Sequence, residues 1–269
     1  MISRFSLILR IPLLFLVGII PLAFSGGSVF ASAGSFPSDN FNTCSIKPQW
    51  GTFINPLHDT STYSVNGSTV SISVPQGVND HDIWATNRVV SINAPRFMMN
   101  AADDNFTIEV KMNSGVSSIY QTQGILIEQD PDTVLRFEFY GDGTNTIMFA
   151  ARLKTGENPT TYYRQQIGVG NISPLYMRVQ RSSGNQWTQS YSTSGTNWTA
   201  GPTNPIVYSM TVTQVGFYGG NTVVHPGDTA PAHTAIFDYF SNLDSPAGPD
   251  TPINCATQTQ KIYLPVVNR

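Results

Sequence analysis

The sequence predicts an all-β protein built from two antiparallel sheets that pack face to face. From residue 39 onward, apolar residues recur at every second position in short segments, which is the period of a half-buried strand. Gly, Pro, Asn and Asp separate these segments, and no stretch shows the 3.6-residue period of an amphipathic helix. Ten or more strands without a helix to cover them can bury their apolar faces only against a second sheet.

The strands follow one another closely along the chain. Alternation is clearest at residues 69–74 and 106–112, where every second residue is apolar. Residues 125–140 predict a hairpin that turns at Asp130-Pro131-Asp132, because proline pre-sets the turn and aspartate can bond to its backbone. The core face of this hairpin would hold Ile125, Ile127, Leu135, Phe137 and Phe139. Further strands are expected at residues 146–153, 161–167, 175–181, 187–192, 212–218 and 235–243.

The N-terminus predicts a signal peptide over residues 1–33. Arg4 and Arg10 precede an uncharged apolar run over residues 11–24, and small side chains at 31–33 suit cleavage after Ala33. The run is shorter than the roughly 20 residues of a membrane-spanning helix, so we expect a secreted or extracellular protein whose mature chain has no membrane span. A retained N-terminal anchor is the alternative.

Charge and composition exclude some partners. The chain has 14 Lys and Arg against 17 Asp and Glu, which argues against a nucleic-acid partner because such binding needs clustered basic residues. Charged residues make up only 12% of the chain, while Asn, Thr, Ser and Gly abound. Such a surface bonds through hydroxyls and amides, which suits polyhydroxyl ligands.

The two cysteines predict a disulfide, and the acidic residues give little sign of a metal site. Cys44 and Cys255 form an even pair in a chain expected to be exported. The four histidines are scattered, so we expect no catalytic metal and no cofactor. A structural calcium ion is the one exception considered, with Asp39 and Asp238 as candidate ligands.

The chain is expected to hold one domain, at residues 34–243. Residues 244–269 begin with a Pro- and Gly-rich linker and end in a short apolar tail. Either the tail adds an edge strand to a sheet, or it serves for sorting or docking at the cell envelope.

An ordered series of short motifs carries a family resemblance. The series includes Asp39-Asn40-Phe41, Asp82-Ile83-Trp84, Gln123-Gly124-Ile125-Leu126-Ile127, Tyr191-Ser192 with Gly195 and Trp198, and Phe237-Asp238-Tyr239-Phe240. It resembles the C-terminal concanavalin A-like domain of family 43 beta-xylosidases. The resemblance implies a jelly-roll β-sandwich of two curved antiparallel sheets, with a concave face where relatives in the wider lectin and glucanase superfamily hold sugars. It does not imply catalysis, because the propeller that hydrolyses the substrate in the xylosidases has no counterpart here.

Sugar binding needs an aromatic ring for stacking and planar polar groups for paired hydrogen bonds. Of the four tryptophans, at least half are expected in the core or in hairpin packing, and Trp84 is the preferred platform because polar residues flank it on one long loop. Tyr120, Gln121 and Gln123 lead into the central strand. The predicted ligand-binding residues are Asp82, Trp84, Arg96, Gln121, Gln123, Glu128, Arg136, Glu138 and Tyr140.

Three functions remain open from the sequence. The first is a secreted, non-catalytic carbohydrate-binding module. The second is a glycoside hydrolase or lyase, in which Glu128 and Glu138 would be the catalytic carboxyls; a cross-strand ion pair between Glu128 and Arg136 is the structural alternative for these charges. The third is a structural or adhesive envelope protein. His81, beside Asp82, is expected to cap a loop.

Overall fold

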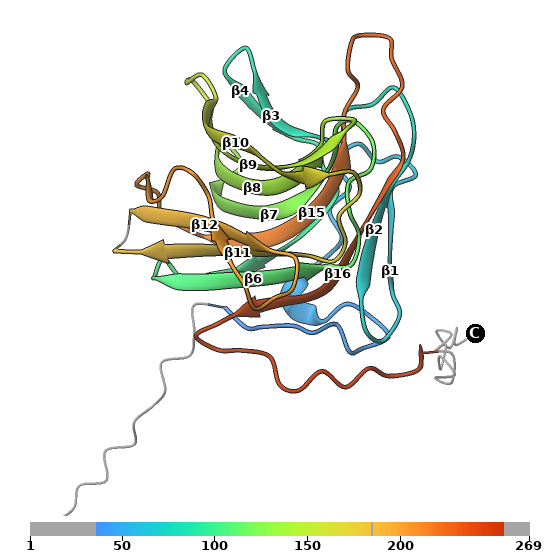
Figure 1. Ribbon diagram of the computed structural model, residues 1–269, viewed down its shortest axis with the longest axis vertical. Coiled ribbons are helices and arrows are strands. Elements are labelled where there is room, and N and C mark those ends of the chain that lie inside the picture. Colours follow the sequence, from blue (N-terminus) through green and yellow to red (C-terminus); the bar gives the residue numbers. More distant parts are fainter. Residues whose placement is uncertain (1–35, 184, 256–269) are drawn as a thin grey trace, which may run out of the picture. The chain divides into compact units, whose positions relative to one another are not determined.

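The computed structural model describes residues 36–183 and 185–255, and strands form almost all of its regular structure (Figure 1). One short 3-10 helix, η1 (Pro48–Trp50), precedes the first strand. The strands are β1 (Thr62–Val65), β2 (Val70–Val74), β3 (Ile83–Thr86), β4 (Val89–Ile92), β5 (Arg96–Asn100), β6 (Phe106–Met112), β7 (Gln121–Asp130), β8 (Thr133–Gly141), β9 (Asn145–Lys154), β10 (Thr160–Val169), β11 (Leu175–Ser182), β12 (Gln186–Ser192), β13 (Thr199–Ala200), β14 (Ile206–Val207), β15 (Gln214–Asn221) and β16 (His233–Asn242).

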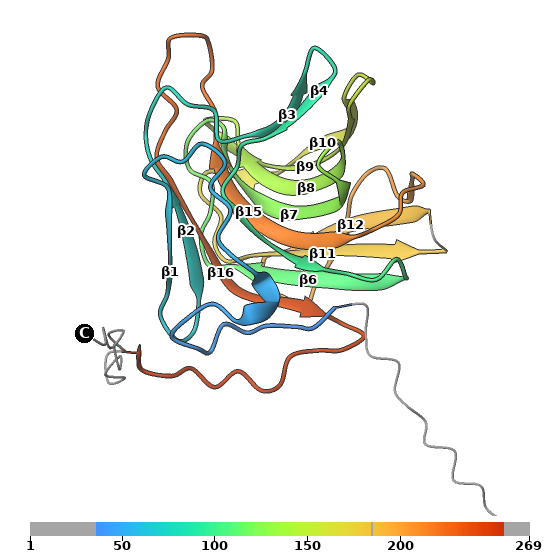
Figure 2. The same ribbon diagram turned by 180° about the vertical axis from the view of Figure 1, so that it is seen from behind.

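Two antiparallel sheets form the sandwich. The first has the order β1-β2-β16-β6-β11-β12-β13, with β14 also paired to β12, and the second has the order β10-β9-β8-β7-β15-β5. Strands β7 to β9 of the second, six-stranded sheet are visibly curved in both views (Figures 1 and 2). The predicted fold, a concanavalin A-like sandwich of two curved antiparallel sheets, is confirmed.

The space between the sheets holds one large apolar core. Alternate residues of both sheets point into it, as the two-residue period of a strand requires. The five side chains predicted for the core face of the β7–β8 hairpin are all fully buried there. Phe217 of β15 lies near the centre, with its ring centroid 4.8 Å from that of Trp50 and 4.5 Å from that of Phe237. Trp50 and Trp187 are both in this core, which confirms that half of the tryptophans serve packing.

Every strand predicted from alternation is present, but the region before β5 differs from the prediction. We expected one long loop around Trp84, whereas β3 and β4 form a separate two-stranded hairpin. Its turn, Asn87-Arg88, has positive φ angles of 52° and 62°, the conformation of a type I′ turn. The usual signal for such a turn is Asn-Gly, so an arginine at the second position hid the hairpin.

The β3–β4 hairpin covers part of the face of the six-stranded sheet that points away from the core, here called the outer face. Ile83 and Ala85 of β3 pack on Leu126, Val134 and other apolar residues of this face in a second, smaller cluster. The hairpin thereby forms one wall over the sheet, beside β9.

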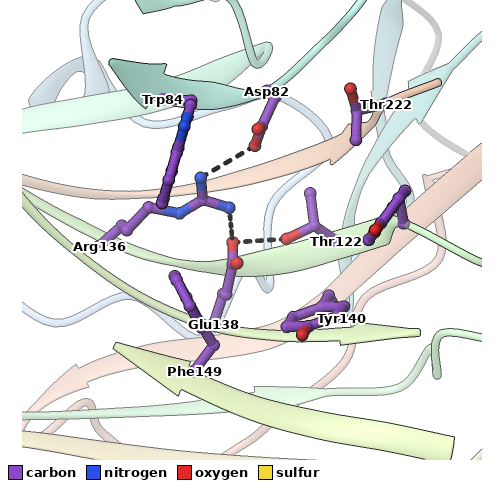
Figure 3. Close-up of a pocket in the computed structure, with 9 residues that line it drawn as sticks. Asp82, Trp84, Thr122, Arg136, Glu138, Tyr140, Phe149 and Thr222 are labelled. Carbon is purple, nitrogen blue, oxygen red and sulfur yellow. Dashed lines mark hydrogen bonds and ion pairs between the residues drawn. The ribbon is translucent and has the colours of Figure 1, made fainter. Parts of the chain in front are cut away.

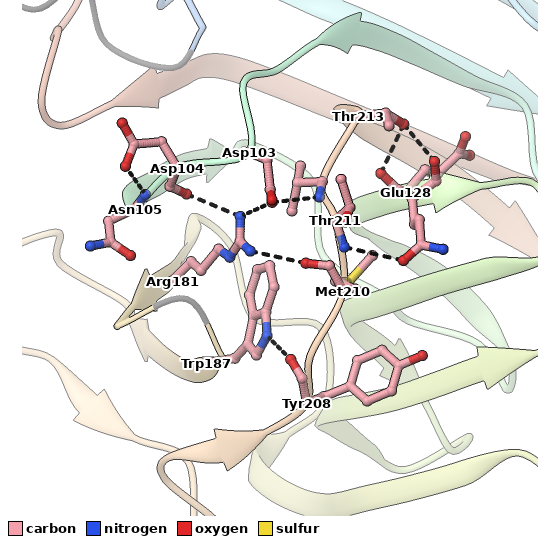
Figure 4. A network of polar contacts seen from close by, with 12 residues as sticks. Asp103, Asp104, Asn105, Glu128, Arg181, Trp187, Tyr208, Met210, Thr211 and Thr213 are labelled. Atoms are coloured by element: carbon pink, nitrogen blue, oxygen red, sulfur yellow. Dashed lines mark hydrogen bonds and ion pairs between the residues drawn. The ribbon is translucent and has the colours of Figure 1, made fainter.

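A buried arginine, Arg181, holds in place the segment that leads into β15 (Figure 4). Arg181 donates to Asp103 Oδ1 at 2.5 Å and to the Met210 carbonyl at 2.9 Å. The same Asp103 oxygen accepts the Val212 amide at 2.8 Å, a hydrogen bond that holds the pKa of Asp103 below its usual value. These bonds tie the segment before β15 to the loop before β6.

A disulfide joins the N-terminal segment before β1 to the last described residue. Cys44 and Cys255 form the predicted disulfide, with Cα atoms 5.3 Å apart. Just before it, the Ile253 amide donates to the Gly67 carbonyl at 2.9 Å, so this part of the expected linker runs along the domain. The predicted signal peptide and the tail at residues 261–269 lie outside the described residues. In the part of the chain that the structure describes, no helix has the length and apolarity needed to cross a bilayer.

Candidate functional site

A pocket of about 360 Å³ opens on the outer face of the six-stranded sheet (Figure 3). Its size falls within the range of roughly 300–1,000 Å³ that is common for small-molecule sites. The lining residues come from β3, β7, β8 and β9, from the residues just before β3 and β7, and from the residue just after β15. They are Asp82, Trp84, Tyr120, Thr122, Arg136, Glu138, Tyr140, Phe149 and Thr222.

Strand alternation and register bring the floor of the pocket together. Arg136, Glu138 and Tyr140 occupy alternate positions of β8, so they share its outer face. Glu138 lies opposite Gly124 of β7 and Phe149 of β9. A Cβ atom on Gly124 would approach the Phe137 carbonyl oxygen to 2.2 Å, so only glycine allows this close pairing with Glu138.

Arg136 is the centre of the polar floor, and only 4% of its surface is exposed. Its Nη1 atom lies 3.0 Å from Asp82 Oδ1 and also donates to the Ile83 carbonyl, while Nη2 donates to Glu138 Oε2 at 2.5 Å (Figure 3). Burial acts to lower the pKa of Arg136, but the charges of Asp82 and Glu138 outweigh it and hold that pKa well above the usual value. The guanidinium therefore stays charged and links the β3–β4 hairpin to the sheet.

Glu138 is also buried, with 2% of its surface exposed, and its Oε2 atom collects three donors. Besides Arg136, Thr122 Oγ1 donates at 2.6 Å and the Tyr218 hydroxyl donates from β15. Burial first, and then the charge of Glu138, raises the pKa of Tyr218 well above its usual value, so this hydroxyl keeps its proton. Three fixed donors define the position of the carboxylate.

Aromatic rings form the walls. The guanidinium of Arg136 lies 5.7 Å from the centroid of Trp84 and 5.5 Å from that of Phe149, in the range of cation–π contacts. Tyr120 and Tyr140 stand nearby with centroids 6.3 Å apart, and Arg164 donates to the Tyr140 hydroxyl. The pocket thus combines partly exposed ring surfaces with charged groups in fixed positions.

The family model of the beta-xylosidase C-terminal concanavalin A-like domain matches residues 38–242, which make up most of the described chain. The chain belongs to this family. No curated protein matches this chain.

Solved structures with the same fold are distant in sequence. A protein of unknown function from Saccharomyces cerevisiae is 16% identical with a TM-score of 0.56, over 76% of this chain and all of the yeast chain. A GH43 protein of Bacillus licheniformis is 17% identical with a TM-score of 0.55. A xylan beta-1,4-xylosidase of Bacillus halodurans is 14% identical with a TM-score of 0.54. The matched region makes up 76% of this chain and 38% of each Bacillus protein. The family domain therefore corresponds to a part of those proteins.

Five of the nine predicted ligand-binding residues meet in the pocket: Asp82, Trp84, Arg136, Glu138 and Tyr140. The prediction missed Thr122, Phe149 and Thr222. Thr122 lies an even number of residues from Glu128, so the two share one face of β7. Alternation along β9 could likewise have placed Phe149 on the outer face. Thr222 follows the end of β15 and no pattern in the sequence marks it.

Gln121 and Gln123 do not reach the pocket. They have the parity of Ile125 on β7, so their side chains turn to the core side of the sheet. Gln121 Nε2 donates to the Ala232 carbonyl at 2.6 Å, and Gln123 Nε2 donates to the Ser114 carbonyl at 2.7 Å. Both amides are buried structural links to neighbouring segments.

Gln123 also contacts His233, whose burial lowers its pKa from 6.5 to about 4. The unfolded chain therefore binds a proton more readily than the folded one between these two pKa values, so stability falls as the pH drops from 6.5 towards 4. We expect this histidine to account for up to about 3 kcal/mol of that loss. Urea unfolding of wild type and His233→Gln at pH 7 and pH 4.5 measures it; equal losses in both proteins would contradict the assignment.

The predicted ion pair between Glu128 and Arg136 is wrong. Glu128 lies opposite Val134, and Arg136 lies opposite Leu126, because a bulge between Glu128 and Asp130 sets the register. Glu128 instead faces Arg96, with Oε1 3.6 Å from Nε. Burial lowers the pKa of Arg96 and raises that of Glu128.

The structure also separates the two carboxyls considered for hydrolysis. Glu138 lies opposite Gly124 of β7. Glu128 lies four residues further along the same strand, and four residues of a strand span about 13 Å. Paired catalytic carboxyls of glycosidases stand roughly 5 to 9.5 Å apart. Glu128 and Glu138 therefore do not form such a pair, and neither Arg96 nor Glu128 lines the pocket.

The remaining candidates have structural partners. Asp39 accepts from Lys47 at 2.6 Å and from the Trp50 indole at 2.9 Å, and Asp238 accepts from Lys111 at 2.8 Å. Across residues 36–183 and 185–255, no three His, Cys, Asp or Glu side chains gather as metal ligands would. His81 is buried and bonds to Asn221 at 2.8 Å and Asp59 at 2.5 Å, which ties a loop in place, as predicted.

Proposed function

We propose that this protein is a non-catalytic module that binds a carbohydrate in the pocket around Trp84. The observation that carries the proposal is the combination, within one pocket, of a partly exposed tryptophan and a rigid Asp82–Arg136–Glu138 group. A pyranose ring presents an apolar face and a rim of hydroxyls. An exposed aromatic ring can stack on the apolar face, and fixed polar atoms can bind the hydroxyls.

The polar group suits binding better than hydrolysis. Glycoside hydrolysis needs one protonated carboxyl as the acid and one charged carboxyl as the nucleophile or base. Asp82 and Glu138 both pair with the guanidinium of Arg136, which fixes the positions of the two carboxyls. Both carboxyls thus belong to one ion-pair group, whereas hydrolysis needs two carboxyls that flank the glycosidic bond.

The related structures suggest which ligands to try first. One of the similar structures is named a xylan beta-1,4-xylosidase. Xylo-oligosaccharides are therefore the first test ligands, followed by other plant and microbial β-linked oligosaccharides.

We further propose that the protein acts outside the cytoplasm. The leader-like sequence at residues 1–33 and the disulfide between Cys44 and Cys255 both support export to an oxidising compartment. Docking of the apolar tail at residues 262–267 to the cell envelope stays a prediction.

Replacing Trp84 with alanine is expected to weaken carbohydrate binding about tenfold or more, because the stacking surface is lost. Trp198→Ala is the matched control. Trp198 is also partly exposed, but it packs on Tyr176 and Arg178 of the eight-stranded sheet, away from the pocket. Isothermal titration calorimetry with xylohexaose, or with the best ligand from a glycan array, measures both variants.

The control variant should bind within about twofold of wild type. Equal weakening by both substitutions would contradict the assigned site, and flat responses across a broad array would contradict carbohydrate binding itself. Sugar turnover detected by chromatography would favour the hydrolase alternative.

A further inference from the structure

Most hydrogen-bond donors on the polar floor of the pocket are already engaged. Arg136 donates from Nη1 to the Ile83 carbonyl and from Nη2 to Glu138, and its Nη1 also lies 3.0 Å from Asp82 Oδ1 in an ion pair. Its Nε is buried and has no partner, so no ligand reaches it in this arrangement. Because Nη1 faces Asp82 and Ile83 and Nε is enclosed, no two parallel N–H groups are open, whereas recognition of a carboxylate or sulfate by arginine uses two parallel N–H groups.

The hydroxyl groups beside the arginine are engaged in the same way. Thr122 donates to Glu138, and Thr222 donates to Asp80 Oδ1. Tyr218, which lies beneath Glu138, also donates to it. Among the hydroxyls that line the pocket, only those of Tyr120 and Tyr140 keep a hydrogen without an acceptor in the described part of the chain.

Acceptor capacity, in contrast, remains open. All three donors to the Glu138 carboxylate bind Oε2, and Oε1 has no hydrogen-bond partner among the described residues while not being fully enclosed. Asp82 pairs with Arg136 through Oδ1, and 23% of its side chain is exposed, leaving Oδ2 accessible. One arginine faces two carboxylates, so the group carries a net charge of −1.

We infer that this pocket selects uncharged or ammonium-bearing sugar units and rejects uronates and sulfated sugars. A sugar hydroxyl or ammonium group can donate to the open carboxylate oxygens. A ligand carboxylate or sulfate brings only acceptors, meets an arginine that is already engaged, and is repelled by the net negative charge. The inference rests on the proposed carbohydrate binding and specifies its ligand class.

The test compares ligands that share one backbone. Calorimetric titrations use β-1,4-linked tetramers of xylose, glucose, glucosamine and glucuronate. The glucuronate tetramer should bind at least about tenfold more weakly than the tightest neutral tetramer, and the glucosamine tetramer should bind at least as tightly as the glucose tetramer. In 0.5 M NaCl the gap between glucose and glucuronate should narrow, because salt screens the repulsion.

Asp82→Asn tests the electrostatic cause. The amide keeps an acceptor for Arg136, removes one negative charge and adds donors, so the penalty on the glucuronate tetramer should shrink severalfold. Asp238→Asn changes the net charge equally on the eight-stranded sheet, next to Lys111, and should leave the penalty unchanged. Thermal unfolding confirms that both variants are folded.

The outcomes separate the two proposals. Binding of the glucuronate tetramer as tight as that of the neutral tetramers overturns the inference and leaves carbohydrate binding intact. A penalty that Asp82→Asn and Asp238→Asn relieve equally also overturns it. Absence of binding to all four tetramers and across a glycan array overturns the proposed function and the inference together.

Discussion

Replacing Arg136 with methionine is expected to lower the free energy of unfolding by about 3–5 kcal/mol. The substitution leaves Glu138 as a buried charge without its cation and removes the link to Asp82 on the β3–β4 hairpin. Methionine keeps much of the apolar contact with Trp84 and Phe149, so the loss reports mainly on the charge. Urea unfolding followed by tryptophan fluorescence measures it.

Two controls isolate the buried charge. Arg178→Met breaks the ion pair with Glu109 on the other sheet, where the arginine side chain is 36% exposed, and should cost about 1 kcal/mol or less. The double variant Arg136→Met/Glu138→Gln should recover part of the loss, because it removes the unpaired charge. A double variant less stable than Arg136→Met alone would show that the loss does not come from Glu138.

The second large effect is expected in the core, where Phe217→Ala should cost about 3–5 kcal/mol. The ring of Phe217 is fully buried between the sheets and lies within 6.1 Å, centroid to centroid, of Phe41, Trp50, Phe97 and two rings of β16. Its removal leaves a cavity that rigid aromatic neighbours cannot easily fill.

Calorimetric or urea unfolding of Phe217→Ala can be compared with Val207→Ala. Val207 is 70% exposed, so its truncation should change stability by no more than about 0.5 kcal/mol. Near-equal effects of the two substitutions would argue against a close-packed interface between the two sheets.

The fold was predictable because its determinants are local. Strict alternation at residues 106–112 and 125–140 fixes which side chains enter the core, and the structure places them there. The turn at Asp130-Pro131-Asp132 was also readable, because proline and aspartate dictate its geometry. The bulge between Glu128 and Asp130 carries no such signal, so the cross-strand partner of Arg136 could not be predicted.

The site was only partly predictable because two of its features depend on tertiary structure. The Asn-Arg turn gives no sequence signal for the β3–β4 hairpin, yet this hairpin places Asp82 and Trp84 over the sheet. Thr222 reaches the pocket only through the pairing of β15 with β7. In contrast, the burial of Gln121 and Gln123 followed from parity with Ile125, so that error could have been avoided on the sequence alone.

The most direct test of carbohydrate binding at the outer face is a nuclear magnetic resonance titration of the indole N–H signals. The chain has four tryptophans, so four signals are expected. Addition of a bound neutral oligosaccharide should shift the signal of Trp84, assigned from the Trp84→Ala spectrum, and leave those of Trp50, Trp187 and Trp198 nearly in place. Binding that shifts the Trp198 signal and not the Trp84 signal would contradict the account.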